Sequence, residues 1–154
     1  MKRVLFVCTG NICRSPTAEG VARHLVAQHG LPIEVDSAGT QGYHVGEPPD
    51  PRAQRVARKR GYDLSKLRAR KLIAADFGLF DLLLAMDRGH LQQMQRMCPP
   101  EFADRVHLFL DYLPGPKTEV PDPYYGGEAG FEHVLDLCED GVNALFAALR
   151  KQGM

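Results

Sequence analysis

Eight residues near the start of the chain combine a nucleophile, turn-forming residues and a cation. They are Cys8-Thr9-Gly10-Asn11-Ile12-Cys13-Arg14-Ser15, and they directly follow the apolar residues 4–7. A loop between a strand and a helix N-terminus points successive backbone N–H groups inward, which makes an anion-binding nest with the helix dipole behind it. Gly10 and Asn11 tolerate the left-handed backbone that such a loop requires. We therefore predict a phosphate-binding loop formed by Thr9, Gly10, Asn11, Ile12, Cys13 and Arg14.

The side chains of this loop suit nucleophilic attack on phosphorus. The positive field of the nest favours the thiolate form of Cys8, which is the nucleophilic form. Arg14 offers a planar fork of donors that matches two phosphate oxygens at once. We expect Ser15 to cap the following helix, with Pro16 at its first position, and its hydroxyl to donate to the sulfur of Cys8. A lone cysteine is more often an inert core thiol, but here strand, loop and helix start agree.

The proton that such a reaction needs must come from another segment. Attack on phosphorus expels an alkoxide or phenoxide, and the donors of the nest are occupied by phosphoryl oxygens, so a carboxylic acid has to reach in. Asp122 stands between two prolines in the irregular residues 111–130, and irregular segments of this length are usually functional. Asp122 is therefore our candidate acid, although an Asp-Pro pair can also simply start a turn.

Three tyrosines stand in the irregular segments, where they could wall a pocket. Tyr124 and Tyr125 follow the candidate acid, and Tyr43 lies within residues 40–50. Aromatic walls would hold a phenyl ring above a phosphate site. A phenol, with a pKa of about 10 against roughly 16 for water, also leaves more readily than a serine alkoxide. This pattern favours an aryl phosphate, although tyrosines in loops can also be plain surface.

The elements that must position these residues alternate along the chain. Apolar runs predict strands at 4–8, 33–37, 80–86 and 106–110, and helical spacing predicts helices at 16–29, 51–60, 91–97 and from 134 onward. Such alternation predicts an α/β fold, a four-stranded parallel sheet flanked by helices on both faces. Ligands bind beyond the carboxyl ends of such strands, where Cys8 stands. A single domain over residues 1–154 fits the length.

Composition and charge exclude several classes of function. The net charge of zero gives no reason to expect nucleic-acid binding or attraction to a membrane, and apolar runs are too short for membrane insertion. Four cysteines without a pairing pattern indicate a reducing compartment, hence a cytoplasmic protein. Six histidines without ligand spacing give no metal site. We expect no cofactor, and a monomer or weak dimer.

Charge is unevenly distributed along the chain. Nine of the nineteen Lys and Arg residues fall between Arg52 and Lys71, whereas residues 119–140 hold seven acidic residues and no Lys or Arg. A run of like charge is usually a solvated face, and this is our interpretation. A docking surface for acidic phosphopeptides is the alternative.

Four segments, in order, resemble the low-molecular-weight protein tyrosine phosphatases. They are VLFVCTGNICRSPTAE (4–19), DSAG (36–39), FDLLLAMD (80–87) and DPYYG (122–126). The resemblance implies hydrolysis of phosphotyrosine through a cysteinyl-phosphate, with Cys8 as nucleophile and Asp122 as general acid and later base. It also favours substrate contacts by Tyr43, Tyr124 and Tyr125. The Thr9-Gly10 pair resembles bacterial members, whose substrate could be a tyrosine kinase.

Two positions vary within this resemblance. Many relatives carry a histidine that braces the phosphate loop through Asn11, and Leu67 stands at the matching position here. Lys66 or another group would have to replace that histidine. Relatives that hydrolyse phosphoarginine tend to carry threonine at the position of Ile12, so Ile12 favours phosphotyrosine, with a phosphoarginine phosphatase as an alternative.

Cysteine positions separate the remaining alternatives. A thioredoxin-coupled arsenate reductase shares this fold but needs two further cysteines after the third strand, where this chain has Ala85 and, further on, only Cys98. A phosphate-binding module without turnover could dispense with Cys8 or Asp122. Cys13 shares one tight loop with Cys8, and we expect it to close a protective disulfide when Cys8 is oxidised.

Overall fold

The sheet has four parallel strands in the order β2-β1-β3-β4. The computed structural model describes residues 1–116 and 118–154. The strands are β1 (Lys2–Cys8), β2 (Ile33–Gly39), β3 (Leu82–Ala85) and β4 (Val106–Leu108). The predicted fold class is confirmed, with strand ends that differ by a few residues. Residue 117, within the irregular segment 111–130, lies outside the described residues.

Strand β1 lies in the middle of the sheet because its side chains are apolar on both faces. Val4, Leu5, Phe6 and Val7 are all fully buried. Val4 and Phe6 belong to the core on one face, and Leu5 and Val7 to the core on the other. Since β1 pairs with both β2 and β3, its carboxyl end is held from two sides, and Cys8 stands at that end.

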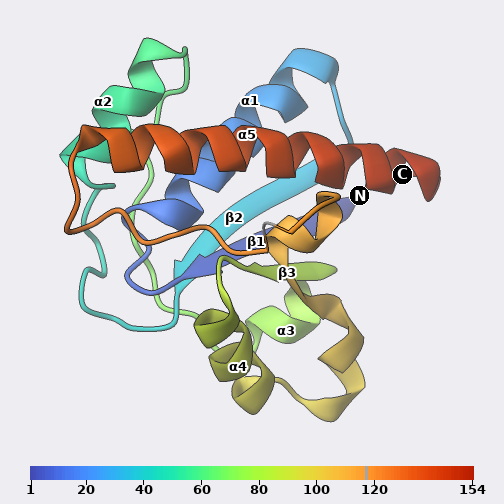
Figure 1. The fold of residues 1–154 in the computed structure, drawn as a ribbon. Coiled ribbons are helices and arrows are strands. Elements are labelled where there is room, and N and C mark those ends of the chain that lie inside the picture. Colours follow the sequence, from blue (N-terminus) through green and yellow to red (C-terminus); the bar gives the residue numbers. More distant parts are fainter. Residues whose placement is uncertain (117) are drawn as a thin grey trace.

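Helices cover both faces of the sheet (Figure 1). α1 (Arg14–His29), α2 (Pro51–Lys59) and α5 (Glu128–Lys151) share the core that contains Val4 and Phe6. The short α3 (Asp76–Leu79) and α4 (Arg88–Met97) pack on the opposite face, where Phe77 and Met94 are fully buried. Two 3₁₀ helices, η1 (Pro100–Arg105) and η2 (Phe109–Tyr112), flank β4. None of the helices within residues 1–116 and 118–154 is long and apolar enough to cross a membrane.

Several predicted ends are wrong, and the start of α1 matters most. The helix begins at Arg14, so Ser15 is not its N-cap and Pro16 occupies its third position rather than its first. Cys13 is the N-cap residue and makes no side-chain capping bond. Proline is tolerated there because N–H groups of the first turn have no partner within the helix. α5 begins at Glu128, six residues before its predicted start at 134 (134 − 128), and α3, η1 and η2 were not predicted.

Some residues of the basic run form ion pairs with acidic residues of helix α5. Arg60, just after α2, lies within 2.7 Å of carboxylate oxygens of Glu132, Asp136 and Glu139 on α5. Arg55 pairs with Glu128 at 2.9 Å. Helix α5 supplies the counter-charges of these arginines, whose side chains stay 54% (Arg55) and 29% (Arg60) exposed, as expected of a solvated face. The docking surface for acidic phosphopeptides stays a prediction.

Candidate active site

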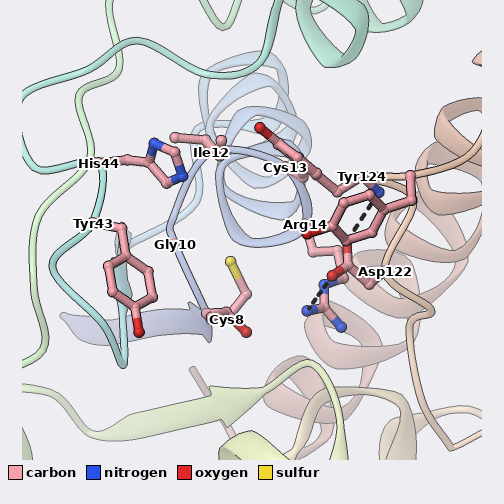
Figure 2. A pocket seen from close by; sticks show the side chains of 11 residues that line it. Cys8, Gly10, Ile12, Cys13, Arg14, Tyr43, His44, Asp122 and Tyr124 are labelled. Carbon is pink, nitrogen blue, oxygen red and sulfur yellow. Dashed lines mark hydrogen bonds and ion pairs between the residues drawn. The ribbon is translucent and has the colours of Figure 1, made fainter.

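The predicted chemical groups meet in one cavity at the carboxyl end of β1. Figure 2 shows Cys8 at its inner end, with Tyr43 and Tyr124 on opposite sides. The cavity has a volume of about 310 Å³ and is lined by Cys8, Thr9, Gly10, Ile12, Cys13, Arg14, Tyr43, His44, Asp122, Tyr124 and Tyr125. Asn11, predicted as a phosphate-binding residue, and Ser15 are buried and are not part of the lining.

The backbone of the loop turns at Asn11. Its φ of 60° makes it the one non-glycine residue with a left-handed backbone within residues 1–116 and 118–154. Gly10 does not have a positive φ, so the predicted reason for a glycine there is wrong. A Cβ at Gly10 would lie 2.8 Å from Cδ2 of His44, closer than side chains approach. Gly10 therefore permits the imidazole of His44 to pack on the loop.

Ser15 contacts the sulfur of Cys8. The Oγ of Ser15 lies 2.9 Å from Sγ of Cys8, and both residues are buried. The side-chain amide of Asn11 donates to Ser15 Oγ at 2.8 Å and to Ser37 Oγ at 2.9 Å. Because the Ser15 oxygen already accepts from Asn11, its own hydrogen can point to the sulfur. The predicted contact between Ser15 and Cys8 is therefore present, although Ser15 does not cap the helix.

A buried carboxylate anchors this chain of hydrogen bonds. Ser37 Oγ donates to Glu19 Oε1 at 2.6 Å, and Arg23 Nε donates to Glu19 Oε2 at 2.6 Å. Burial raises the pKa of Glu19, while the bonds from Ser37 and Arg23 act in the opposite direction. Because the carboxylate of Glu19 accepts the hydrogen of Ser37, the Ser37 oxygen is free to accept from Asn11. Donor and acceptor roles are thereby set along the hydrogen bonds from Glu19 to Cys8. The sequence analysis did not identify Glu19 or Ser37 as site residues. The feature that could have indicated them is a polar residue within a segment that is otherwise predicted to be buried.

The group that braces Asn11 is the backbone of Arg70. Its N–H donates to Asn11 Oδ1 at 3.0 Å, and its guanidinium is held by Asp36 and Asp76. Leu67 instead packs against the core. A main-chain donor thus takes part in the bracing for which the resemblance implies a histidine, and the suggested Lys66 is not that donor.

Arg14 is held in place from behind the cavity. The residue is 4% exposed, and its Nη1 donates to Asp87 Oδ2 at 2.9 Å and to the carbonyl of Val120 at 3.0 Å. Asp87 follows β3 and also caps α4 through the His90 amide. A guanidinium with one edge fixed by these two acceptors keeps its remaining N–H groups for an anion in the cavity.

Asp122 stands at the mouth of the cavity. Its side chain is 52% exposed, with Oδ2 3.9 Å from Arg14 Nη2. Its other oxygen accepts from the Tyr124 backbone N–H at 3.0 Å, the local bond by which an aspartate shapes a turn. One carboxylate oxygen thus fixes the turn while the other faces the arginine.

The tyrosines form an exposed rim. Tyr43 is 75% and Tyr125 94% exposed, whereas Tyr124 is 38% exposed. The rings of Tyr124 and Tyr125 meet edge to face with centroids 5.1 Å apart, and the guanidinium of Arg52 lies over the Tyr124 ring. The predicted placement of all three around one cavity is confirmed. Arg52 and His44 are further rim residues that sequence reasoning missed.

Cys13 is the second thiol of the cavity. It is buried, and desolvation, followed by the negative charge of Asp50, raises the pKa of its thiol well above the ordinary value. Cys13 is therefore a protonated thiol at neutral pH. All four cysteines are free.

Comparison with known proteins gives one consistent result. Residues 3–154 match the family model described as low molecular weight phosphotyrosine protein phosphatase. A low molecular weight protein-tyrosine-phosphatase of Streptomyces coelicolor is 47% identical, covering 97% of this chain and 94% of that protein. One of Bacillus subtilis is 39% identical, covering 99% and 98%. The crystal structure of a protein tyrosine phosphatase from Entamoeba histolytica superposes with a TM-score of 0.94 at 38% identity, covering all of both chains.

Proposed function

Because the chain belongs to the low molecular weight phosphotyrosine protein phosphatase family, a family of hydrolases, we propose that its cavity hydrolyses phosphotyrosine through a cysteinyl-phosphate. The observation that carries this proposal is one cavity with Cys8 at its inner end, Arg14 beside it and Asp122 at its mouth. Cys8 and Arg14 come from one loop and Asp122 from a segment more than a hundred residues later, and each has the chemistry that one step requires.

In the first step the thiolate of Cys8 attacks phosphorus. The loop amides and Arg14 hold the three phosphoryl oxygens, whose charge they stabilise in the transition state. As the S–P bond forms and the P–O bond breaks, Asp122 in its acid form gives its proton to the leaving phenolic oxygen. Tyrosine leaves, and the enzyme retains a cysteinyl-phosphate and an ionised Asp122.

In the second step water takes the place of the phenol. Asp122 accepts a proton from the water as its oxygen attacks phosphorus, and the S–P bond breaks to release inorganic phosphate. The hydroxyl of Ser15, 2.9 Å from Sγ, stabilises the departing thiolate by donating to it. The cycle consumes one water and restores both Cys8 and Asp122 to their starting forms.

The rim supports an aromatic substrate within a protein. Tyr43 and Tyr124 stand on opposite sides of Cys8, where a phenyl ring could pack between aromatic surfaces. Ile12 adds an apolar wall, which favours the ring of phosphotyrosine over the charged guanidinium of phosphoarginine. A phosphotyrosine-bearing protein, such as a bacterial tyrosine kinase, is the partner we propose.

The arsenate reductase alternative lacks a thiol relay. Ala85 ends β3, and Cys98 follows the far end of the ten-residue helix α4. A helix of that length spans about 15 Å, which separates Cys98 from the residues at the start of α4 that contact Arg14. A disulfide cannot be passed from Cys8 to a thiol at that distance.

The test is release of phosphate from para-nitrophenyl phosphate and from a phosphotyrosine peptide, with EDTA present and thioredoxin absent. We expect turnover of both and much slower turnover of phosphoserine and phosphoarginine peptides. Hydrolysis of phosphoarginine at an equal or higher rate would contradict the proposed substrate. Arsenate reduction without phosphate release would contradict the proposed reaction.

A further inference from the structure

His90 is a buried histidine beside the cavity that the proposed mechanism does not use. It lies in the first turn of α4 and is 4% exposed. Its Nε2 lies 2.7 Å from Oγ1 of Thr9 and 3.5 Å from Nη2 of Arg14. Its Nδ1 lies 3.1 Å from Oδ1 of Asp87, a close contact that is bent away from hydrogen-bond geometry. One imidazole thus touches the phosphate loop, its arginine and the carboxylate that holds that arginine.

These neighbours determine which nitrogen carries the proton. A guanidinium has donors and no acceptor, so the Nε2 that faces Arg14 carries a lone pair. The hydroxyl of Thr9 then donates to that lone pair, and the ring N–H is at Nδ1, facing the Asp87 carboxylate. The contacts of Nε2 determine this tautomer, and the carboxylate 3.1 Å from Nδ1 is compatible with it, although Nδ1 makes no hydrogen bond there.

The same surroundings keep the ring neutral. Burial, followed by the positive charge of Arg14, lowers the pKa of His90 to about 4, while the carboxylates of Asp87, Asp122 and Glu119 act in the opposite direction. At neutral pH the imidazole is therefore an acceptor at Nε2. A proton on Nε2 would put a second cation against Arg14 and would turn the hydroxyl of Thr9 away.

We propose that His90 is a positioning residue for phosphate binding, which holds Thr9 and the inner edge of Arg14 in the phosphate-accepting arrangement before substrate arrives. The inference rests on the proposed function of the cavity. Arg14 has two other anchors, Asp87 and Val120, whereas the Thr9 side chain depends on His90. Loss of His90 therefore weakens anion binding more than it slows the chemical step.

The experiment measures the dissociation constant of inorganic phosphate for the full chain and five variants, together with KM and kcat for para-nitrophenyl phosphate. His90→Ala removes the acceptor, Thr9→Val removes its donor at nearly constant volume, and a double variant combines them. His90→Gln restores an acceptor oxygen that cannot be protonated. His29→Gln, at the exposed end of α1, is the matched control.

We expect His90→Ala and Thr9→Val each to weaken phosphate binding and raise KM about tenfold, the effect of losing one hydrogen bond, with kcat changed less than threefold. The double variant should be no worse than either single variant, His90→Gln should recover most of the affinity, and the control should match the parent. Additive losses, or an unchanged dissociation constant in Thr9→Val, would overturn the proposal.

A spectroscopic measurement on the unmodified chain covers the case in which a His90 variant fails to fold. The ¹⁵N shifts of the His90 ring at pH 6 should show a neutral imidazole with its proton on Nδ1, and a proton on Nε2 would overturn the proposal. Failure of the proposed function is distinguishable, because it would appear as absent turnover of phosphotyrosine by the parent, while phosphate binding would still report the coupling between Thr9 and His90.

Discussion

The floor and the rim of the cavity differ in how firmly they are held. The floor is formed by Cys8 and Arg14, and Asn11 and Ser15 support it from outside the lining. All four residues are at most 4% exposed and are held by hydrogen bonds. The rim consists of Asp122 and the three tyrosines, which lie outside regular elements and are more than a third exposed. In the proposed mechanism the phosphoryl group, common to every substrate, meets the floor, and the variable leaving group meets the rim.

The fold explains this difference. The floor lies between β1, which is paired on both sides, and α1, so its residues are tied to regular elements. The rim comes from connecting segments, which tolerate change and commonly carry specificity. Substitutions in the floor should therefore alter catalysis for all substrates alike, and substitutions in the rim should alter the ranking among substrates.

The largest effect is expected from Cys8→Ser, which removes the nucleophile and keeps the rest of the floor. A serine hydroxyl is a poor nucleophile without an adjacent base, so turnover should fall below detection for every aryl phosphate. Binding of inorganic phosphate should stay within about threefold of the parent, because the amides and Arg14 remain. Turnover within tenfold of the parent would contradict the assignment of Cys8.

Asp122→Ala tests the rim residue that takes part in chemistry. General acid catalysis contributes about 10² to 10⁴ in rate, so kcat for phenyl phosphate should fall by that factor. A substrate whose leaving group needs no proton should lose far less. Asp122→Asn is the control, because its amide oxygen can still accept from Tyr124 and so keep the turn. Normal activity of Asp122→Asn would mean that this residue only shapes the loop.

Replacing Tyr43 or Tyr125 with Ala should change the choice of substrate by a smaller amount. Aromatic contacts contribute about 0.5–1.5 kcal/mol, so KM for a phosphotyrosine peptide should rise roughly two- to tenfold while kcat stays nearly constant. Tyr43→Phe, which keeps the ring, should behave like the parent. The measured quantity is the ratio of kcat/KM between phosphotyrosine and phosphoserine peptides, and an unchanged ratio would refute the aromatic rim.

The smallest effect concerns Cys13, which lines the cavity without a role in the proposed steps. Peroxide should oxidise Cys8 first, to a sulfenic acid, and Cys13 should condense with it to a disulfide and release water. Dithiothreitol would then restore activity. In Cys13→Ser a smaller fraction of activity should return, because Cys8 proceeds to the irreversible sulfinic acid. Equal recovery in parent and variant would exclude a protective role.

Residues whose chemistry lies in one continuous segment could be predicted from the sequence. The loop that begins at Cys8 and the candidate acid Asp122 were predicted in this way, and the structure places Cys8, Arg14 and Asp122 in the lining of one cavity. The cap assigned to Ser15 was wrong, because the helix begins at Arg14 with Cys13 as its N-cap residue, and residue types alone do not determine at which residue the first helical turn begins.

The side chains that strand pairing brings next to the loop could not be predicted from the sequence. Phe6 lies opposite Ser37, and Val7 opposite Ala85, which brings Ser37 behind the loop and Asp87 beside Arg14. A shift of the strands by two residues would keep every apolar pattern and would separate these pairs. His90 has the same origin, since α4 follows directly from Asp87.

The order of the site residues along the chain also sets when the site is completed on the ribosome. Asp122 is translated 114 residues after Cys8 (122 − 8), which at typical rates of synthesis is an interval of about 6–23 s. Strand β1 emerges first and cannot pair with β3 until more than half of the chain exists. Until residues 87 and 120 have been translated, Arg14 lacks both of its anchors, and the loop around Cys8 is not yet held in its folded arrangement. We therefore expect Cys8 of a nascent chain to react with peroxide as an ordinary thiol, and to become the preferred target only when the fold is complete.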